Sequence, residues 1–323
     1  MTDETNSHAL YIWLIMIALI ILLPWFLPGR YYLFLTTMVG IYTIMVVGLN
    51  LIVGFTGLIS IAHGAFFGIG AYTCAILQVR GVMPYWPALA VGTIFTGLVG
   101  ALVGVAILRA RGPYLAIGTM ALSILTAMVL MNWQGLTGGA SLGGIGGPGT
   151  LRIGDWHVDF YSGKTYYYFV YILVVVSMTG VYRLIHSRIG RAFMAIRGRE
   201  ELAEAIGINT MHFKILSFTI GCLLAGLAGG LYAGFMGAID PDIASVGMSF
   251  NLLVMTIVGG AGTLSGAFIG TVLLWLLPEV LQASEEYKPL LFGIILLVII
   301  IFMPKGIMGR VRELHPALDK WVK

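Results

Sequence analysis

Long apolar segments alternate with short polar connections along the whole chain. The apolar runs cover approximately residues 9–28, 31–53, 64–80, 84–108, 114–131, 166–185, 214–237, 248–258, 267–281 and 289–303. A helix needs about 20 apolar residues to cross the hydrocarbon core of a bilayer, and several runs reach that length. The pattern predicts an all-α polytopic membrane protein with about 10 transmembrane segments, some broken or re-entrant, in a single domain over residues 1–323.

Glycine-rich sequence interrupts two of the apolar stretches. GFTGLISIAHG, Gly54 to Gly64, divides 31–80, and GGAGTLSG, Gly259 to Gly266, divides 248–281. Irregular backbone at membrane depth persists only where protein or a water-filled cavity satisfies its polar groups. The breaks therefore predict a permeation path. The candidate pathway residues are Asn50, Gly54, Gly57, Ser60, His63, Tyr72, Gly259, Gly260 and Gly262. Close helix packing is the alternative for any single one of them.

The first apolar run, 9–28, resembles the core of a signal peptide only in its hydrophobicity. It lacks a basic segment before it, and no small-residue cleavage site follows it. We expect a retained first span rather than a cleaved leader.

Residues 183–214 are the one long polar stretch between apolar segments, and they hold six of the 18 Lys and Arg residues. With this stretch in the cytoplasm, thirteen basic residues fall on the cytoplasmic side and five on the other. This is a strong positive-inside bias. It predicts that both termini are cytoplasmic and that the loop at 132–165 and the acidic pairs Asp240/Asp242 and Glu285/Glu286 are external.

The polar stretch divides into a basic first part and a short second helix that starts after Gly198. Three glutamates occupy the early turns of this helix, where the helix dipole favours negative charge: Glu200, Glu201 and Glu204. Leu202 and Ile206 share a face, and Gly207 supplies the stop. Such a helix suits docking into a groove of a partner protein. A solvated loop lying on lipid headgroups is the alternative.

Composition narrows the functional class. The chain is 59% hydrophobic and 10% charged, with 44 glycines, so it cannot cover the surface of a soluble domain. Its net charge of +4 is explained by the positive-inside bias and does not indicate nucleic-acid binding. Cys74 and Cys222 lie in apolar runs, and no disulfide framework or metal site is indicated.

Several chemical motifs fail on inspection. SGKT at 162–165 ends like a phosphate-binding loop, but Val158 stands where the first glycine belongs and the sequence predicts no strand before it. The spans contain no serine–histidine–acid set, which argues against an enzyme. Proton- or ion-coupled carriers need ionisable residues in the membrane interior, and only Glu279 comes close. Transport would therefore be passive or driven by another subunit.

Six sequence blocks, in order from about Gly48 to Gly309, carry a family resemblance. They are GLNLIVGFTGLISIAHGAF, RGPYLAIGTMAL, NWQGLTGG, GRAFMAIRGREELAEAIGIN with LAGLAGGLYA, IVGGAGTLSGAFIG and PKGIMG. Together they resemble the LivM-type permease of bacterial branched-chain amino acid ABC transporters. The spacing of Glu201, Ala203 and Gly207 is similar to the loop by which such permeases engage their ATPases.

The resemblance implies a permease subunit in a bacterial or archaeal plasma (inner) membrane. It implies a LivH-like second permease, two cytoplasmic ATP-binding subunits and an external substrate-binding protein. ATP would bind to the partner subunits, and the permease itself would need no cofactor. The implied ATPase-coupling residues are Arg197, Glu200, Glu201, Ala203, Glu204 and Gly207.

Three positions depart from the family pattern: Ala62 before the histidine, Ala140–Leu142 after LTGG, and Gly198 after AIR. The first two bear on the cargo, because related permeases carry urea or short-chain amides. A permease or passive channel for urea or short-chain amides is therefore the alternative to an amino-acid importer.

Overall fold

The structure is a computed structural model that describes residues 29–153, 156–160 and 163–280, together with 293, 294, 297, 301, 303 and 306–314. Five of its helical segments are long and apolar enough to cross a membrane. They are α2 (Arg30–Asn50) with the π-helical segment η1 (Leu51–Phe55) that continues it, α4 (Tyr85–Ile107), α5 (Pro113–Asn132), α7 (Gly163–Ile185) and α10 (Thr210–Met236). Three shorter apolar helices are α3 (His63–Val79), α11 (Val246–Gly259) and α12 (Leu264–Val280).

These eight helices match eight of the predicted apolar runs, and the chain is a multi-pass membrane protein. The predicted run at 9–28 and most of that at 289–303 lie outside the described residues, so the count of 10 spans stays a prediction. The short helix α14 (Gly306–Leu314) follows the last run.

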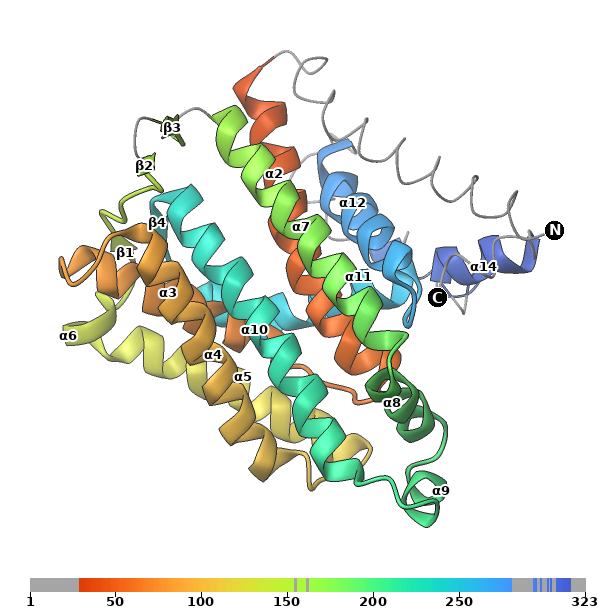
Figure 1. Cartoon of the computed structure of the whole chain (residues 1–323). Helices are drawn as coiled ribbons and strands as arrows, with labels where there is room; N and C mark the ends of the chain where they lie inside the picture. The colour runs from red at the N-terminus through yellow and green to blue at the C-terminus, as the bar shows by residue number, and fades with distance from the viewer. Residues whose placement is uncertain are drawn as a thin grey trace.

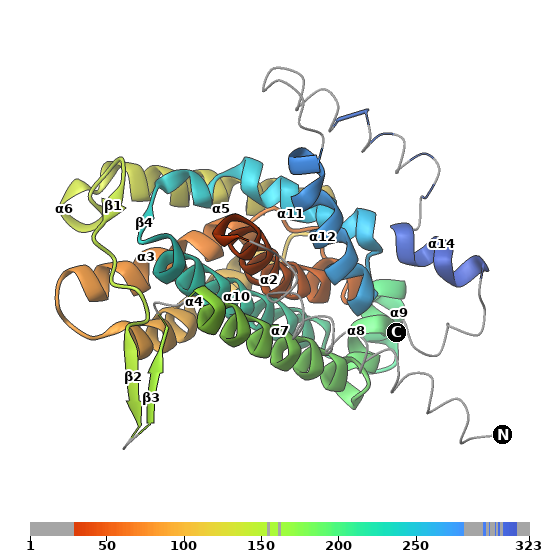
Figure 2. The same cartoon turned by 90° about the horizontal axis from the view of Figure 1, so that it is seen from above.

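Helix α2 lies at the centre of the bundle, with α7, α10 and α12 around it (Figures 1 and 2). On another side, α10 packs against both α3 and α4. Small residues allow this close approach. A Cβ at Gly70 of α3 would collide with the backbone of Gly226 of α10, and a Cβ at Gly226 would lie 2.6 Å from the Cβ of Thr96 of α4.

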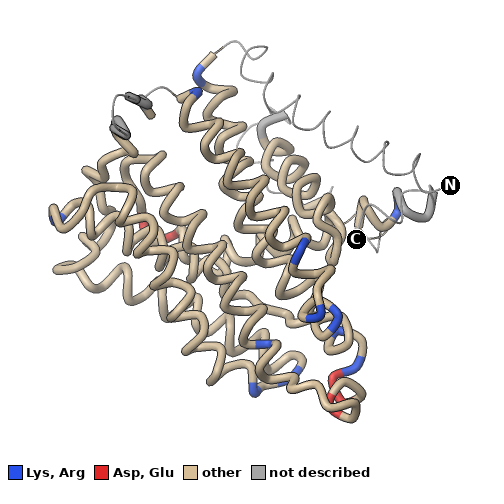
Figure 3. The backbone as a smooth tube through the Cα atoms, viewed as in Figure 1, with Lys and Arg blue, Asp and Glu red and all other residues tan. Residues whose placement is uncertain are grey.

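One end of the molecule carries most of the charge, and we call it the basic end. It comprises the α4–α5 connection, α8 (Arg188–Gly198) and α9 (Glu200–Ala205), and Figure 3 shows Lys and Arg gathered there. The predicted split of 183–214 into a basic first part and a short second helix is thus confirmed as structure.

The opposite end carries short strands that the all-α prediction did not include. Helix α6 (Gln134–Thr137), β1 (Leu142–Gly143) and the antiparallel pair β2 (Thr150–Ile153) and β3 (Trp156–Asp159) lie within the predicted loop 132–165. Strand β1 pairs with β4 (Ala238–Ile239), which directly follows α10. The pairing of β1 with β4 therefore attaches this loop to the end of α10. Glycine-rich turns allow the chain to make the tight reversals that this pairing needs.

Two helices, α3 and α11, begin in the middle of the bundle rather than at its ends. The amide of Gly64 donates to Ser249 Oγ at 2.9 Å, and the hydroxyls of Ser249 and Ser123 lie 3.3 Å apart. Ser123 is the eleventh residue of the 20-residue helix α5, so this contact lies at mid-depth. With 14 residues, α11 is about 21 Å long, which is shorter than the roughly 30 Å hydrocarbon core.

Extended chain leads into both of these helices. Residues 57–62 precede α3, and residues 237–245, including the 3₁₀ turn η2 (Pro241–Ala244), precede α11. In the first segment, the amide of Ile61 donates to Thr119 Oγ1 at 3.0 Å and its carbonyl accepts from Ser123 Oγ at 2.7 Å. Side chains of α5 therefore satisfy backbone that a bilayer could not.

The position of the second break differs from the prediction. The glycine-rich segment Gly259–Gly266 contains the tight turn between α11 and α12, and this turn lies at the basic end beside Gly54. The mid-depth interruption of this span lies instead at 237–245. The acidic IDPD sequence there reads as an external loop, although Pro241, Ile243 and Ala244 are buried in the bundle.

Candidate coupling site at the basic end

Helix α8 lies against the bundle through one apolar face. Ser187 caps its start, where Ser187 Oγ accepts from the amide of Ile189 at 3.1 Å. Phe193 and Ile196 are buried, whereas Arg188 and Arg191 are exposed. The amphipathic pattern thus positions α8 against the bundle with Arg188 and Arg191 outward.

Helix α9 is held by its glutamates rather than presenting all of them to solvent. Glu200 accepts a hydrogen bond from Lys214 Nζ, and it lies 3.6 Å from the guanidinium of Arg111. Glu204 lies 3.5 Å from the same guanidinium and accepts from Thr210 Oγ1 at 2.8 Å. Two of the three glutamates thus tie α9 to α10 and to the α4–α5 connection.

The opposite face of α9 is apolar and open. The side chains of Leu202 and Ile206 are 59% and 74% exposed, whereas Ala203 is buried. Glu201 is exposed beside them. Gly207 ends the helix with φ +84°, a conformation that favours glycine, and its amide donates to the Glu204 carbonyl at 2.9 Å. The predicted apolar face and stop are both present.

The sequence did not reveal that Lys214 is a buried residue with a structural role at the basic end. It lies in the first turns of α10 with its side chain only 4% exposed, and Glu200 is its ion-pair partner. A buried ammonium needs such a partner because its desolvation is costly. A lysine directly before a long apolar run was the available signal, but nothing in the sequence identified its partner.

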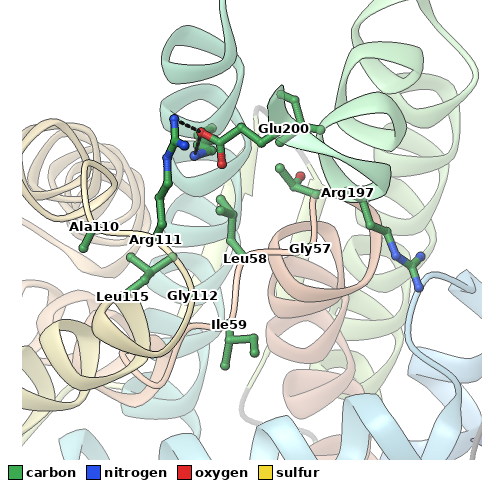
Figure 4. A pocket seen from close by; sticks show the side chains of 12 residues that line it. Gly57, Leu58, Ile59, Ala110, Arg111, Gly112, Leu115, Arg197 and Glu200 are labelled. Atoms are coloured by element: carbon green, nitrogen blue, oxygen red, sulfur yellow. Dashed lines mark hydrogen bonds and ion pairs between the residues drawn. The ribbon is translucent and has the colours of Figure 1, made fainter. Parts of the chain in front are cut away.

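A small open hollow of about 120 Å³ lies behind this ion-pair cluster (Figure 4). Its walls come from the segment after η1, the α4–α5 connection, the start of α5, α8, α9 and α10. They include Thr56, Gly57, Leu58, Ile59, Ala110, Arg111, Gly112, Leu115, Ile196, Arg197, Glu200 and Lys214. Figure 4 shows Arg111 and Glu200 reaching toward each other across its rim, whereas Ile59 points away from them.

Arg197 connects α8 to both glycine-rich segments. A Cβ at Gly57 would lie 3.1–3.3 Å from Arg197, and a Cβ at Gly262 would collide with its guanidinium. In Figure 4 the guanidinium extends away from the hollow toward the α11–α12 turn. Only small residues at Gly57 and Gly262 leave room for this side chain.

Asn50 joins the end of α2 to the same turn. Its Nδ2 donates to the Thr263 carbonyl at 2.8 Å, and its Oδ1 accepts from the Gly262 amide at 2.8 Å. Gly54 packs directly on this contact, because a Cβ there would collide with Asn50 Oδ1 and the Gly262 amide. The two glycine-rich segments that were predicted to border a path, Gly54–Gly64 and Gly259–Gly266, therefore meet, and the carboxamide of Asn50 lies between them.

The remaining candidate pathway residues lie inside the subunit. Ser60, His63 and Tyr72 are buried, as are Gly259 and Gly260. The His63 ring nitrogens and the Tyr72 hydroxyl have no hydrogen-bond partner among the described residues. Of the nine candidates, Gly57 is exposed and lines the hollow. Contact of the buried side chains with cargo stays a prediction.

Comparison with known proteins identifies relatives over most of the chain. Residues 31–302 match the family described as "Branched-chain amino acid transport system / permease component". The chain is 30% identical to the high-affinity branched-chain amino acid transport system permease protein LivM of Salmonella typhimurium, over 92% of this chain and 75% of that protein. It is also 30% identical to LivM of Escherichia coli, over 93% of this chain and 75% of that protein.

A second type of permease protein matches as well. The permease protein LivH of Escherichia coli is 28% identical, over 85% of this chain and 93% of that protein. No solved structure matches the chain.

The first testable prediction concerns the Glu200–Lys214 pair. Glu200→Gln leaves the Lys214 ammonium buried without its counter-charge, which costs about 3–5 kcal/mol in a fully buried pair. We expect a smaller loss here, since Glu200 is 23% exposed. Thermal unfolding and limited proteolysis near residues 199–209 should show a lower melting temperature and faster cleavage.

Glu201→Gln is the matched control, because it removes the same charge from the neighbouring exposed position. Equal effects of the two substitutions would show that the ion pair does not hold α9 in place.

Proposed function

Because the chain belongs to the family of permease components of branched-chain amino acid transport systems, we propose that it is a membrane-spanning permease subunit of an ATP-driven importer of branched-chain, aliphatic amino acids. The family and the LivM and LivH relatives support the assignment of branched-chain amino acids as the cargo. The observation that supports ATP as the energy source is α9, a short helix at the basic end, where two apolar residues, Leu202 and Ile206, are exposed.

The partner at α9 is an ATP-binding subunit on the cytoplasmic side, and the complete assembly contains two of them. An exposed amphipathic helix is a recurring element in groove recognition. ATP binds to and is hydrolysed by these subunits, so the permease carries no cofactor and no catalytic residue of its own. Arg197, Glu200, Ala203 and Glu204 position the helix, whereas Glu201 and the Leu202–Ile206 face meet the partner.

The basic end is the cytoplasmic end, and the membrane is a bacterial or archaeal plasma membrane. Lys and Arg are concentrated there as the positive-inside rule requires (Figure 3). The described basic residues of α7, the α4–α5 connection, α8, α9 and the start of α10 are Arg109, Arg111, Arg183, Arg188, Arg191, Arg197, Arg199 and Lys214, against Arg30, Arg80, Arg152 and Lys164 at the other end. With this orientation both termini are cytoplasmic and the β1–β4 region is external.

A second, LivH-like permease completes the membrane part, and an external binding protein delivers the cargo. Closure of the ATPases on ATP moves α9. The Glu200–Lys214 and Glu204–Arg111 contacts pass this motion to α10 and to the α4–α5 connection, and Arg197 passes it to Gly57 and the α11–α12 turn. The two permeases then exchange outward- and inward-facing states.

Loss of ATPase docking provides the second prediction. Ile206→Asp places a charge on the apolar face of α9, so we expect the tagged permease to bring down little ATPase from solubilised membranes. Val82→Asp is the control, because Val82 is 60% exposed at the opposite end. Undiminished co-purification of the ATPase with the Ile206→Asp permease would refute α9 as the docking element.

Uptake competition provides the third prediction and tests the cargo. In cells that depend on this transporter, unlabelled leucine or valine should suppress uptake of radiolabelled leucine, and urea at the same concentration should leave it unchanged. Suppression by urea together with no effect of valine would replace the amino-acid assignment by the urea or short-amide alternative.

A further inference from the structure

One stripe of α11 is exposed at mid-depth although part of it is polar. Gly247 and Asn251 are exposed on adjacent turns, and Phe250 beside them is 53% exposed. Asn251 lies two residues beyond Ser249, which contacts Ser123 in the middle of α5. At 1.5 Å per residue the amide lies within a few ångströms of the bundle's mid-plane. A carboxamide facing lipid tails there would lose its hydrogen bonds to water.

The exposed face of α4 shows what contact with lipid requires. Its exposed residues over the length of the helix are Pro87, Ala90, Val91, Ile94, Phe95, Leu98, Leu102, Val105 and Ala106. All of them are apolar. The contrast indicates that the α11 stripe does not face hydrocarbon.

Acidic residues precede this stripe on the side away from the basic end. Asp240 and Asp242 are exposed, while Ile243 and Ala244 of the same segment are buried. Ala244 packs on α3 at Gly68, where an added Cβ would lie 2.6 Å from it. The carboxylates thus belong to chain that enters the bundle, and ionised groups in that position also require water.

The same stripe is closed toward the basic end. Residues spaced by three and four lie on one helical face, and the next two on the face of Gly247 and Asn251 are Val254 and Val258. Both valines are buried, with exposures of 7% and 1%. On the face of Gly247 and Asn251 the surface therefore changes from open and polar to covered and apolar within two turns, while Ile257, on the neighbouring face of Phe250, is 40% exposed.

We propose that this stripe is a wall of the cargo route, open to water from Asp240 and Asp242 as far as Asn251 and shut at Val254 and Val258. The proposal rests on the transport function above. The carboxylates attract the ammonium group of a zwitterionic amino acid, and the Asn251 amide offers a donor and an acceptor at mid-depth. The valines form the apolar gate that opens when the route turns inward.

Cysteine accessibility in the complete transporter tests this route. Single cysteines replace Gly247, Asn251, Val254, Val258 or, as a lipid-facing control, Leu98. A membrane-impermeant methanethiosulfonate is added from outside to membrane vesicles of known orientation, and mass spectrometry of the isolated subunit gives the rate. Background is low because Cys74 and Cys222 are fully buried. Only a water-exposed thiol ionises and reacts.

In the absence of ATP we expect Gly247→Cys and Asn251→Cys to react at least an order of magnitude faster than Leu98→Cys, Val254→Cys and Val258→Cys. Saturating leucine-loaded binding protein should slow the Asn251→Cys reaction. Gly247→Cys keeps the test valid if Asn251→Cys does not assemble, because a Cβ at Gly247 meets nothing closer than 3.7 Å.

Rates at Gly247→Cys and Asn251→Cys as low as at Leu98→Cys would overturn the proposal, because lipid or the second permease would then cover the stripe. Fast reaction at all four α11 positions would overturn the gate. Neither result would bear on ATPase docking or on leucine uptake, which test the proposed function separately.

Discussion

The structure depends on a requirement of the bilayer, in which interrupted backbone must find its hydrogen-bond partners within the protein. The amide of Asn50 meets this requirement at the basic end, where it binds both Gly262 and Thr263 in the α11–α12 turn. At mid-depth, Thr119 and Ser123 bind the backbone of Ile61, and Ser249 binds the amide of Gly64. The segment before α3 and the α11–α12 turn are thus each attached to another helix by specific polar side chains.

These attachments make the breaks suitable for conformational change. A continuous helix would have to lose many of its own hydrogen bonds to bend, whereas a broken one exchanges a few contacts with its neighbours. The Asn50 contact lies directly beside Arg197, which belongs to the same polar segment, 183–214, as α9. The place where the two glycine-rich segments meet is therefore next to the place where the ATPases are proposed to act. Helix α11 leads away from this contact toward mid-depth, and it holds the buried Val258 and Val254 and then the exposed Asn251.

Sequence patterns were sufficient for the helices and for the local chemistry of α9. Hydrophobic runs marked eight described apolar helices, and the glutamates, Leu202 and Gly207 marked a short helix with its stop. The depth of the helix breaks in the membrane was harder to predict, because it is determined by contacts between residues that are distant in the sequence. IDPD at 239–242 reads as an external loop until the contact between Ala244 and Gly68 places the following residues inside the bundle. Gly259–Gly266 reads as a mid-membrane break until Asn50 places it at the basic end.

The roles of individual polar side chains were the least predictable feature. Asn50, His63 and Tyr72 were chosen for the cargo path because they are polar residues in apolar surroundings, and the structure places all three inside the subunit. Lys214 was counted only as one more basic residue, although it binds Glu200. Asn251 went unnoticed, since a single asparagine in an apolar run does not reveal which way it faces.

In the proposed mechanism, motion from the ATPases reaches the cargo route through Arg197 and through the contact of Asn50 with the α11–α12 turn. The most direct measurement is the ratio of ATP hydrolysed to leucine imported by the complete transporter in liposomes, with Asn50 and with Asn50→Leu. Leucine has a similar size and lacks both hydrogen bonds. We expect ATP hydrolysis to persist while import falls, so that the ratio rises by an order of magnitude. An unchanged ratio with undiminished import would contradict the account.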